Sequence, residues 1–237
     1  MKTWQGIWLI AKHELLNERR SILFSFLLVN YTTFMIIAVI HQSAPLNEYT
    51  VWVENFLFLT LMPMFGFTLN RTMMRVWSED TYSYKLADMR SMPITSRQIA
   101  GSRLLQFTIF FTVGWLYFFT MIYLIVDWAG EMELLAFLGF ALIWYAYGVV
   151  IGSIYICFEL GVSGKQYMYM TLVFMAFFGL VTLGLEVTQI GLIRKSALLM
   201  IEGTWWLPVV LMIAAVGLMW LIYTAIHSRI ERRSLFL

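Results

Sequence analysis

Residues Leu104–Val126 read LLQFTIFFTVGWLYFFTMIYLIV, a run of twenty-three residues that contains no Asp, Glu, Lys or Arg. The hydrocarbon core of a bilayer is about 30 Å thick, and an α-helix rises about 1.5 Å per residue. About 20 apolar residues therefore suffice to cross the core. The run predicts a membrane-spanning helix.

Similar apolar runs recur along the whole chain. Hydrophobic residues make up 61% of it and charged residues only 13%, whereas about a quarter of an ordinary soluble domain is charged. We expect one all-α integral membrane domain, residues 1–237, with six transmembrane helices. Pro63 and Gly66 favour a kink in the second of these helices. The spans are expected at Ile22–Ile40, Tyr49–Leu69, Leu104–Val126, Leu135–Phe158, Tyr167–Leu185 and Leu207–Ile226.

The basic residues indicate how the chain is oriented. Fourteen of the sixteen Lys and Arg residues fall in segments that alternate to one side of the expected membrane. Short cytoplasmic loops collect Lys and Arg during insertion. We therefore expect a multi-pass protein of the plasma membrane with both termini in the cytoplasm. The two exceptions are Arg194 and Lys195.

The N-terminal segment, residues 2–20, predicts an amphipathic helix on the inner membrane surface. At about 100° per residue, one face collects Trp4, Ile7, Trp8, Ala11 and Leu15. Trp is typical of the membrane interface. An alternative is a plain extension of the first span, but the polar stretch Asn17-Glu18-Arg19-Arg20 favours a separate surface helix.

The segment between the fifth and sixth spans, residues 186–206, is too apolar for a free loop. It is also too charged and too short to cross the bilayer. A re-entrant or interfacial segment on the outer face fits both properties. Arg194 and Lys195 can then extend towards the headgroups.

The longest inner loop, residues 70–103, holds six of the sixteen basic residues. Thr95 and Gln98 have the spacing of a capping box and predict a short helix over Ser96–Ser102 that leads towards the third span. Apolar Met92 and Ile94 beside Arg97 suit docking in a groove of another protein. The alternative is a basic loop placed by the insertion rule alone.

The stretch Ser91-Met-Pro-Ile-Thr-Ser-Arg-Gln-Ile-Ala-Gly-Ser-Arg-Leu-Leu105 resembles the coupling region of membrane subunits of type-2 ATP-binding-cassette exporters. In both, a small residue, Pro, an apolar residue and Ser or Thr lead through a basic residue, Ile and Gly into the third span. The overall plan of surface helix, six spans, coupling loop and outer re-entrant segment is also similar. Met92 departs from the Leu or Thr that is frequent there.

The resemblance implies a permease subunit that exports cargo without chemistry of its own. Two membrane subunits, identical or paralogous, would assemble with two separate ATPase subunits, which bind ATP and Mg. The surface helix 2–20 would also touch the ATPase, and a bacterial plasma membrane is implied. The residues implied in coupling to the ATPase are Met92, Pro93, Ile94, Thr95, Ser96, Arg97, Gln98 and Ile99.

Two further patterns concern packing and cargo. Gly148 and Gly152 have the GxxxG spacing that allows another helix to approach closely. The apolar spans favour a hydrophobic or amphipathic cargo: a peptide, a drug-like compound or a lipid.

The sequence offers no recognisable catalytic, cofactor or metal site. Residues Gly161–Gln166 only superficially resemble a phosphate-binding loop, because no Ser or Thr follows Lys165. The three histidines lie in separate segments. We expect no enzyme activity and no nucleic-acid partner. Two alternatives stay open: a permease-like immunity or regulatory protein that does not transport, and a membrane-embedded enzyme.

Overall fold

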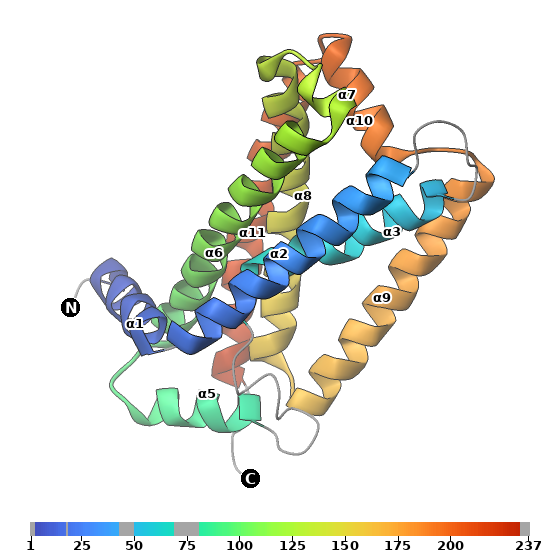
Figure 1. Cartoon of the computed structure of the whole chain (residues 1–237). Helices are drawn as coiled ribbons and strands as arrows, with labels where there is room; N and C mark the ends of the chain where they lie inside the picture. Colours follow the sequence, from blue (N-terminus) through green and yellow to red (C-terminus); the bar gives the residue numbers. More distant parts are fainter. Residues whose placement is uncertain (1–2, 18, 43–49, 69–80, 233–237) are drawn as a thin grey trace.

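The structure, a computed structural model, describes residues 3–17, 19–42, 50–68 and 81–232. The described residues form helices and connecting turns, without strands. In chain order the elements are α1 (Thr3–Asn17), α2 (Arg19–Gln42), α3 (Thr50–Leu61), the 3-10 helix η1 (Met62–Gly66), α5 (Thr81–Ser91), α6 (Ser96–Ile125), α7 (Asp127–Gly130), α8 (Leu134–Gly161), α9 (Gly164–Val187), α10 (Leu192–Ile201) and α11 (Trp206–Arg232). Figure 1 shows their arrangement.

Five of the described helices are long and apolar enough to cross a membrane, namely α2, α6, α8, α9 and α11. Several such helices and the absence of strands from the described residues are typical of a multi-pass, all-α membrane protein. The expected second span differs, because α3 ends at Leu61 and continues as the short 3-10 helix η1. Pro63 lacks the backbone N–H that a continuing α-helix would need. The expected ends of this span, Tyr49 and Leu69, lie outside the described residues.

The start of α6 confirms the predicted capping box. The Gln98 backbone N–H donates to Thr95 Oγ1 at 3.3 Å, and the Thr95 N–H donates to Gln98 Oε1 at 3.0 Å. The expected short helix over 96–102 is not a separate element, however. It forms the first turns of one 30-residue helix that runs on through the third span, since Gly101 alone is too weak a break to end it.

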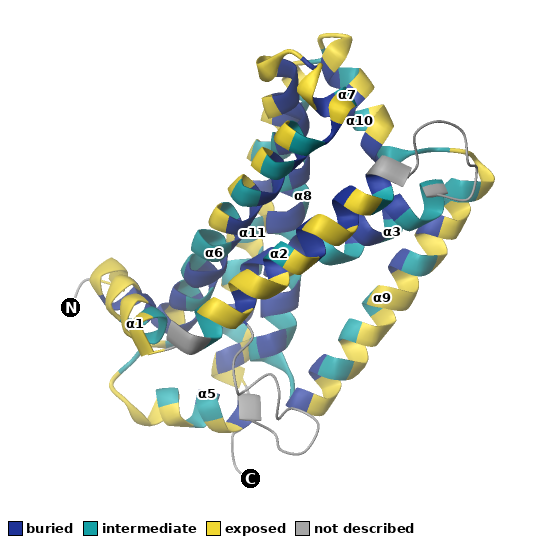
Figure 2. Ribbon diagram, viewed as in Figure 1, coloured by how far each residue is buried: buried dark blue, intermediate teal, exposed yellow. Residues whose placement is uncertain are grey.

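Helix α8 lies at the centre of the bundle, with α11 along one side and α6 along another (Figure 1). Half of the residues in its most apolar 18-residue stretch are buried, compared with 11% of the residues in the corresponding stretches of α9 and α11. Figure 2 shows the contrast between the buried centre and the exposed faces of the outer helices. The core is rich in aromatic side chains, and the fully buried phenylalanines are Phe58, Phe107, Phe111, Phe118 and Phe140.

Gly148 and Gly152 of α8 receive aromatic rings of α6. A Cβ at Gly148 would lie 2.1 Å from Phe111 Cζ, and a Cβ at Gly152 would lie 1.9 Å from Phe107 Cζ. The two rings stack on each other with centroids 5.5 Å apart. The glycine pair therefore makes two hollows for side chains rather than a contact between two backbones.

The end of the bundle opposite α1 carries α7 and α10 (Figure 1). Helix α10 buries Ile193, Ala197 and Met200 and exposes Arg194 and Lys195. Asn55 of α3 fixes the segment before it, because its side chain donates to the Ile190 carbonyl at 3.0 Å and accepts from the Leu192 N–H at 2.9 Å. The expected segment 186–206 thus contains an amphipathic helix held against α3 and α8.

The glycine hollows predict a large effect of a single methyl group. We expect Gly152→Ala to lower the free energy of unfolding by about 1–3 kcal/mol, because the added Cβ must displace the buried ring of Phe107. Gly184→Ala is the matched control, since nothing lies within 4 Å of a Cβ there. Thermal unfolding in detergent measures both variants. Equal stability of the two would contradict the packing described.

Candidate coupling surface at the basic end

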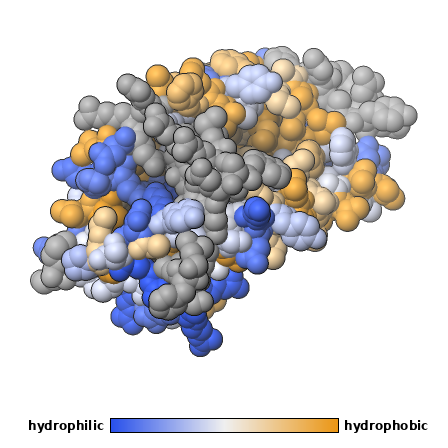
Figure 3. Space-filling view, turned by 90° about the horizontal axis from the view of Figure 1, so that it is seen from below, coloured by the Kyte–Doolittle hydropathy of each residue, from blue (hydrophilic) through white to orange (hydrophobic). Residues whose placement is uncertain are grey.

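One end of the bundle collects α1, α5, the C-terminal end of α11 and the N-terminal ends of α2, α6 and α9 (Figure 1). We call it the basic end. The described Lys and Arg residues other than Arg194 and Lys195 belong to elements that meet there: Lys12, Arg19, Arg20, Lys85, Arg90, Arg97, Arg103, Lys165, Arg229 and Arg232. Figure 3 looks onto this end, where hydrophilic surface gathers beside apolar surface.

Helix α1 packs against the first half of α6. Close approach occurs at two glycines, since a Cβ at Gly6 would lie 2.2 Å from Gln98 Nε2, and one at Gly101 would lie 2.6 Å from Ile7 Cδ1. Ile7 and Ala11 are buried in this contact. Helix α1 is therefore docked on α6 as a fixed part of the basic end.

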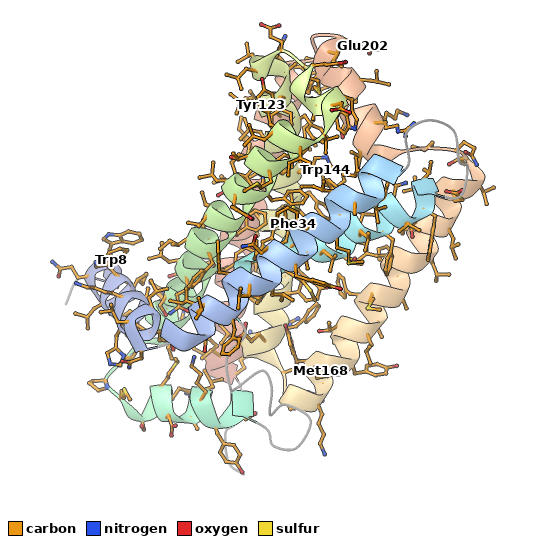
Figure 4. All side chains as sticks on the ribbon, in the orientation of Figure 1. Trp8, Phe34, Tyr123, Trp144, Met168 and Glu202 are labelled. Atoms are coloured by element: carbon orange, nitrogen blue, oxygen red, sulfur yellow. The ribbon has the colours of Figure 1, made fainter. Side chains whose placement is uncertain are left out.

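The expected apolar face of α1 is divided in the structure. Trp4 and Trp8 are exposed, although Ile7 and Ala11 are buried, and Trp8 points away from the bundle (Figure 4). The expected face is therefore only partly buried in the protein. Trp side chains suit a membrane interface, so the buried stripe serves the protein and the exposed tryptophans are available to headgroups.

The stretch 92–99, which is predicted to couple to an ATPase, begins with an exposed tip between α5 and α6. Met92 is 54% exposed and Pro93 is also exposed. The turn is closed by a hydrogen bond of 2.7 Å from the Ile94 N–H to the Met92 carbonyl. Ile94 packs against the core behind the tip. Two apolar side chains are therefore presented to the surroundings on a braced turn.

Ser96 and Arg97 are tied to the C-terminal end of α11. Arg97 Nε donates to His227 Nε2 at 3.3 Å, and Ser96 Oγ lies 2.9 Å from His227 Nδ1. Because Nε2 accepts, Nδ1 carries the proton and donates to Ser96. Ser96 in turn donates to Glu231 Oε1 at 3.2 Å. No local pattern predicts this contact, since His227 lies 131 residues from Ser96.

The last two residues of the stretch face inwards. Gln98 and Ile99 are buried, at 9% and 1% exposure. The eight expected coupling residues therefore divide into three groups. Met92, Pro93, Thr95 and Arg97 are exposed and available to another protein, Ile94 and Ser96 are partly buried, and Gln98 and Ile99 are buried and fix α6 against its neighbours.

A chain of polar side chains runs behind this surface through four helices. Lys85 of α5 pairs with Glu14 of α1 at 2.9 Å, and Glu14 accepts a hydrogen bond of 2.5 Å from Gln106 of α6. The Gln106 amide oxygen accepts from Arg103 Nη1 at 3.3 Å. Arg103 then binds Glu159 of α8. We call these five residues the polar chain.

The Arg103–Glu159 pair is the buried part of the polar chain. Arg103 Nε lies 3.1 Å from both carboxylate oxygens, and Nη2 lies 3.0 Å from Oε2. The two side chains are only 13% and 7% exposed. A buried ion pair is tolerated when its geometry is good and its other hydrogen-bond donors are satisfied. Removing one partner strongly destabilises the fold, because the other charge is left buried without a partner. The pair therefore fixes the register of α6 on α8.

Glu14 is ionised within the polar chain. Burial alone would raise the pKa of its carboxyl group. The charge of Lys85, hydrogen bonds from Lys85 and Gln106, and the charge of Arg103 outweigh burial and lower the pKa below its ordinary value. Docking of α1 thus includes an electrostatic contribution at neutral pH.

Within the described residues, no group of three or more His, Cys, Asp or Glu side chains could hold a metal ion. Comparisons of the chain with protein-family models, with curated proteins and with solved structures find no match. The geometry of the basic end is therefore the basis for any functional inference.

The buried pair predicts a characteristic mutational pattern. Arg103→Met or Glu159→Met alone should lower stability by about 3–5 kcal/mol, because each leaves a buried charge without its partner. The double variant should recover much of this loss, since neither charge of the pair is then left buried without its partner. Thermal unfolding in detergent provides the test. Additive losses in the double variant would mean that the two charges do not act together.

The lowered pKa of Glu14 predicts that α1 loosens in acid. The unfolded chain binds a proton at higher pH than the folded chain, so the stabilisation is complete above the ordinary pKa of glutamate. It is lost as the pH falls through the lowered pKa. Spin labels on Leu9→Cys and Leu116→Cys, with Cys157→Ser, should show the distance distribution broadening in this range. Glu14→Gln should remove the pH dependence, and an unchanged profile in that variant would assign it to another group.

Proposed function

We propose that this chain is the membrane subunit of an ATP-driven transporter that exports a hydrophobic or amphipathic molecule. A separate ATPase subunit would bind the basic end and hydrolyse ATP. A second membrane subunit, identical or paralogous, would complete the translocation path. The chain would lie in a bacterial plasma membrane, with the basic end and both termini in the cytoplasm.

The observation that carries the proposal is the position of Met92 and Pro93. They form an exposed apolar tip at the basic end, outside the long apolar helices. In protein contacts, a few side chains that become fully desolvated in pockets of the partner carry most of the binding energy. Met92 and Pro93 are placed to act as such anchors. Arg97 beside the tip adds a positive charge that suits an acidic rim.

Force applied at the tip has a short path into the bundle. Ile94, Ser96 and Arg97 connect it to the core and to α11. Ser96 is also the first residue of α6, which continues without a break to Ile125. Thirty residues at about 1.5 Å each make a rod about 45 Å long, longer than the hydrocarbon core of about 30 Å. A displacement at the tip would therefore tilt a helix that reaches the opposite end.

The polar chain supports the same role. It joins α5 and α1 to α6 and α8 at the level of the coupling stretch. These elements would move together when the ATPase subunits close, because a paired buried charge resists separation from its partner. ATP-driven closure could in this way be converted into a change in the packing of the long helices.

The proposal predicts a selective loss of partner binding. We expect Met92→Glu to remove capture of the ATPase subunit by the tagged chain in mild detergent, because a charge replaces an apolar anchor. Leu134→Glu is the matched control, since Leu134 is 58% exposed and lies at the other end of the bundle. Captured ATPase activity and thermal unfolding are measured for both variants.

The outcomes separate the proposed function from its alternatives. Loss of ATPase activity in Met92→Glu, with normal unfolding and an unaffected control, would support the coupling role. A wild-type chain that captures no ATPase would argue against a transport subunit. Capture without transport in vesicles would instead indicate a regulatory or immunity protein.

A further inference from the structure

A groove opens between α2, η1 and α6, away from the coupling surface. Its lining includes Ser25, Val29, Phe65, Phe67, Phe110 and Gly114. Two of its walls, α2 and α6, are long enough and apolar enough to cross a membrane. In a bilayer crossed by these two helices, the groove would face the hydrocarbon, because its lining residues 110–117 lie near the middle of α6.

The shape of the groove comes from a missing side chain and from open rims. Residue 114 is glycine, and a Cβ there would lie 3.0 Å from Phe65 Cβ, so η1 sits close against α6 at the floor. Phe26 and Val113 line the rims and are exposed. The groove is thus closed on the protein side and open towards the lipid-facing surface.

The polar groups of the lining are satisfied within the protein. The Ser25 hydroxyl donates to the Ser21 carbonyl at 2.7 Å. The Tyr117 hydroxyl donates to Asn30 Oδ1. An occupant is therefore offered apolar surface, and a polar molecule would lose hydrogen bonds on entering without gaining replacements.

The extent of the groove suits a linear chain. Along α2 the lining runs from Ile22 to Val29, which is about 10 Å at the helical rise of about 1.5 Å per residue. The same helix begins with Arg19 and Arg20, so two basic residues precede this part of the groove in the sequence. Basic residues at the membrane surface attract the phosphate of a lipid headgroup.

We propose that this groove is a binding site for one acyl chain of a membrane phospholipid. The acyl chain of the lipid lies along α2, and the lipid headgroup lies towards the basic end. It fills the space between α2, η1 and α6 and adds van der Waals contacts to the side chains that line the groove. The site requires only that α2 and α6 cross a bilayer, so it does not depend on the proposed transport function.

The test uses phosphatidylcholine vesicles that contain a fraction of phosphatidylcholine with a photoreactive diazirine in one acyl chain. After irradiation, mass spectrometry compares adducts on residues 22–29 of α2 with adducts on residues 209–216 of α11, which expose Val209, Ile213 and Val216. We expect a several-fold excess on α2. Native mass spectrometry after a detergent wash should also show one retained phospholipid.

Val113→Trp should block the groove and reduce the adducts on α2 to the level of α11, with loss of the retained lipid. Leu116→Trp is the control, because Leu116 is 53% exposed, close to the 58% of Val113, and does not line the groove. If Val113→Trp fails to fold, Ser25→Leu fills the groove from α2 instead. Equal labelling of α2 and α11, labelling that neither variant changes, or a cross-link to a second protein chain in place of lipid would each overturn the proposal.

Discussion

The antiparallel contact between α6 and α8 is the interaction on which the rest of the bundle depends. It is fixed at five levels along the two helices by one ion pair, two phenylalanine rings packed on glycines and two hydrogen bonds. The pairs are Arg103 with Glu159, Phe107 with Gly152, Phe111 with Gly148, Thr112 with Tyr145 and Trp115 with the Ala141 carbonyl. Several elements pack on this pair, with α1, α2, α7 and η1 on α6 and α10 and α11 on α8, whereas α3 packs mainly on α9, α2 and η1.

Local features of the fold could be predicted because they depend on neighbouring residues. The capping box of Thr95 and Gln98 involves residues three apart, and the interruption at Pro63 follows from a missing N–H. The division of α1 into a buried stripe and exposed tryptophans could not be predicted in the same way. Helical periodicity places residues on a face, but both protein and membrane interface accept apolar side chains.

The candidate site was only partly predictable for a related reason. The stretch 92–99 could be identified by its local pattern, but its anchoring could not. His227 and Glu159 contact residues 130 and 56 positions away in the chain. No pattern in the sequence around His227 or Glu159 indicates that these residues have such distant partners. Their roles follow from the crossing of α6 with α8 and α11, which the order of apolar runs does not specify.

The two glycine hollows of α8 also bear on how this architecture can change during evolution. Space taken by a side chain at position 152 must be released by the ring at position 107, and positions 148 and 111 are linked in the same way. A larger residue at either glycine clashes with the ring, and a smaller residue in place of either phenylalanine leaves a cavity. Paired substitutions conserve the volume. Distant relatives of this chain should therefore show compensating changes at these two pairs, a covariation signature that can persist after overall sequence similarity has been lost.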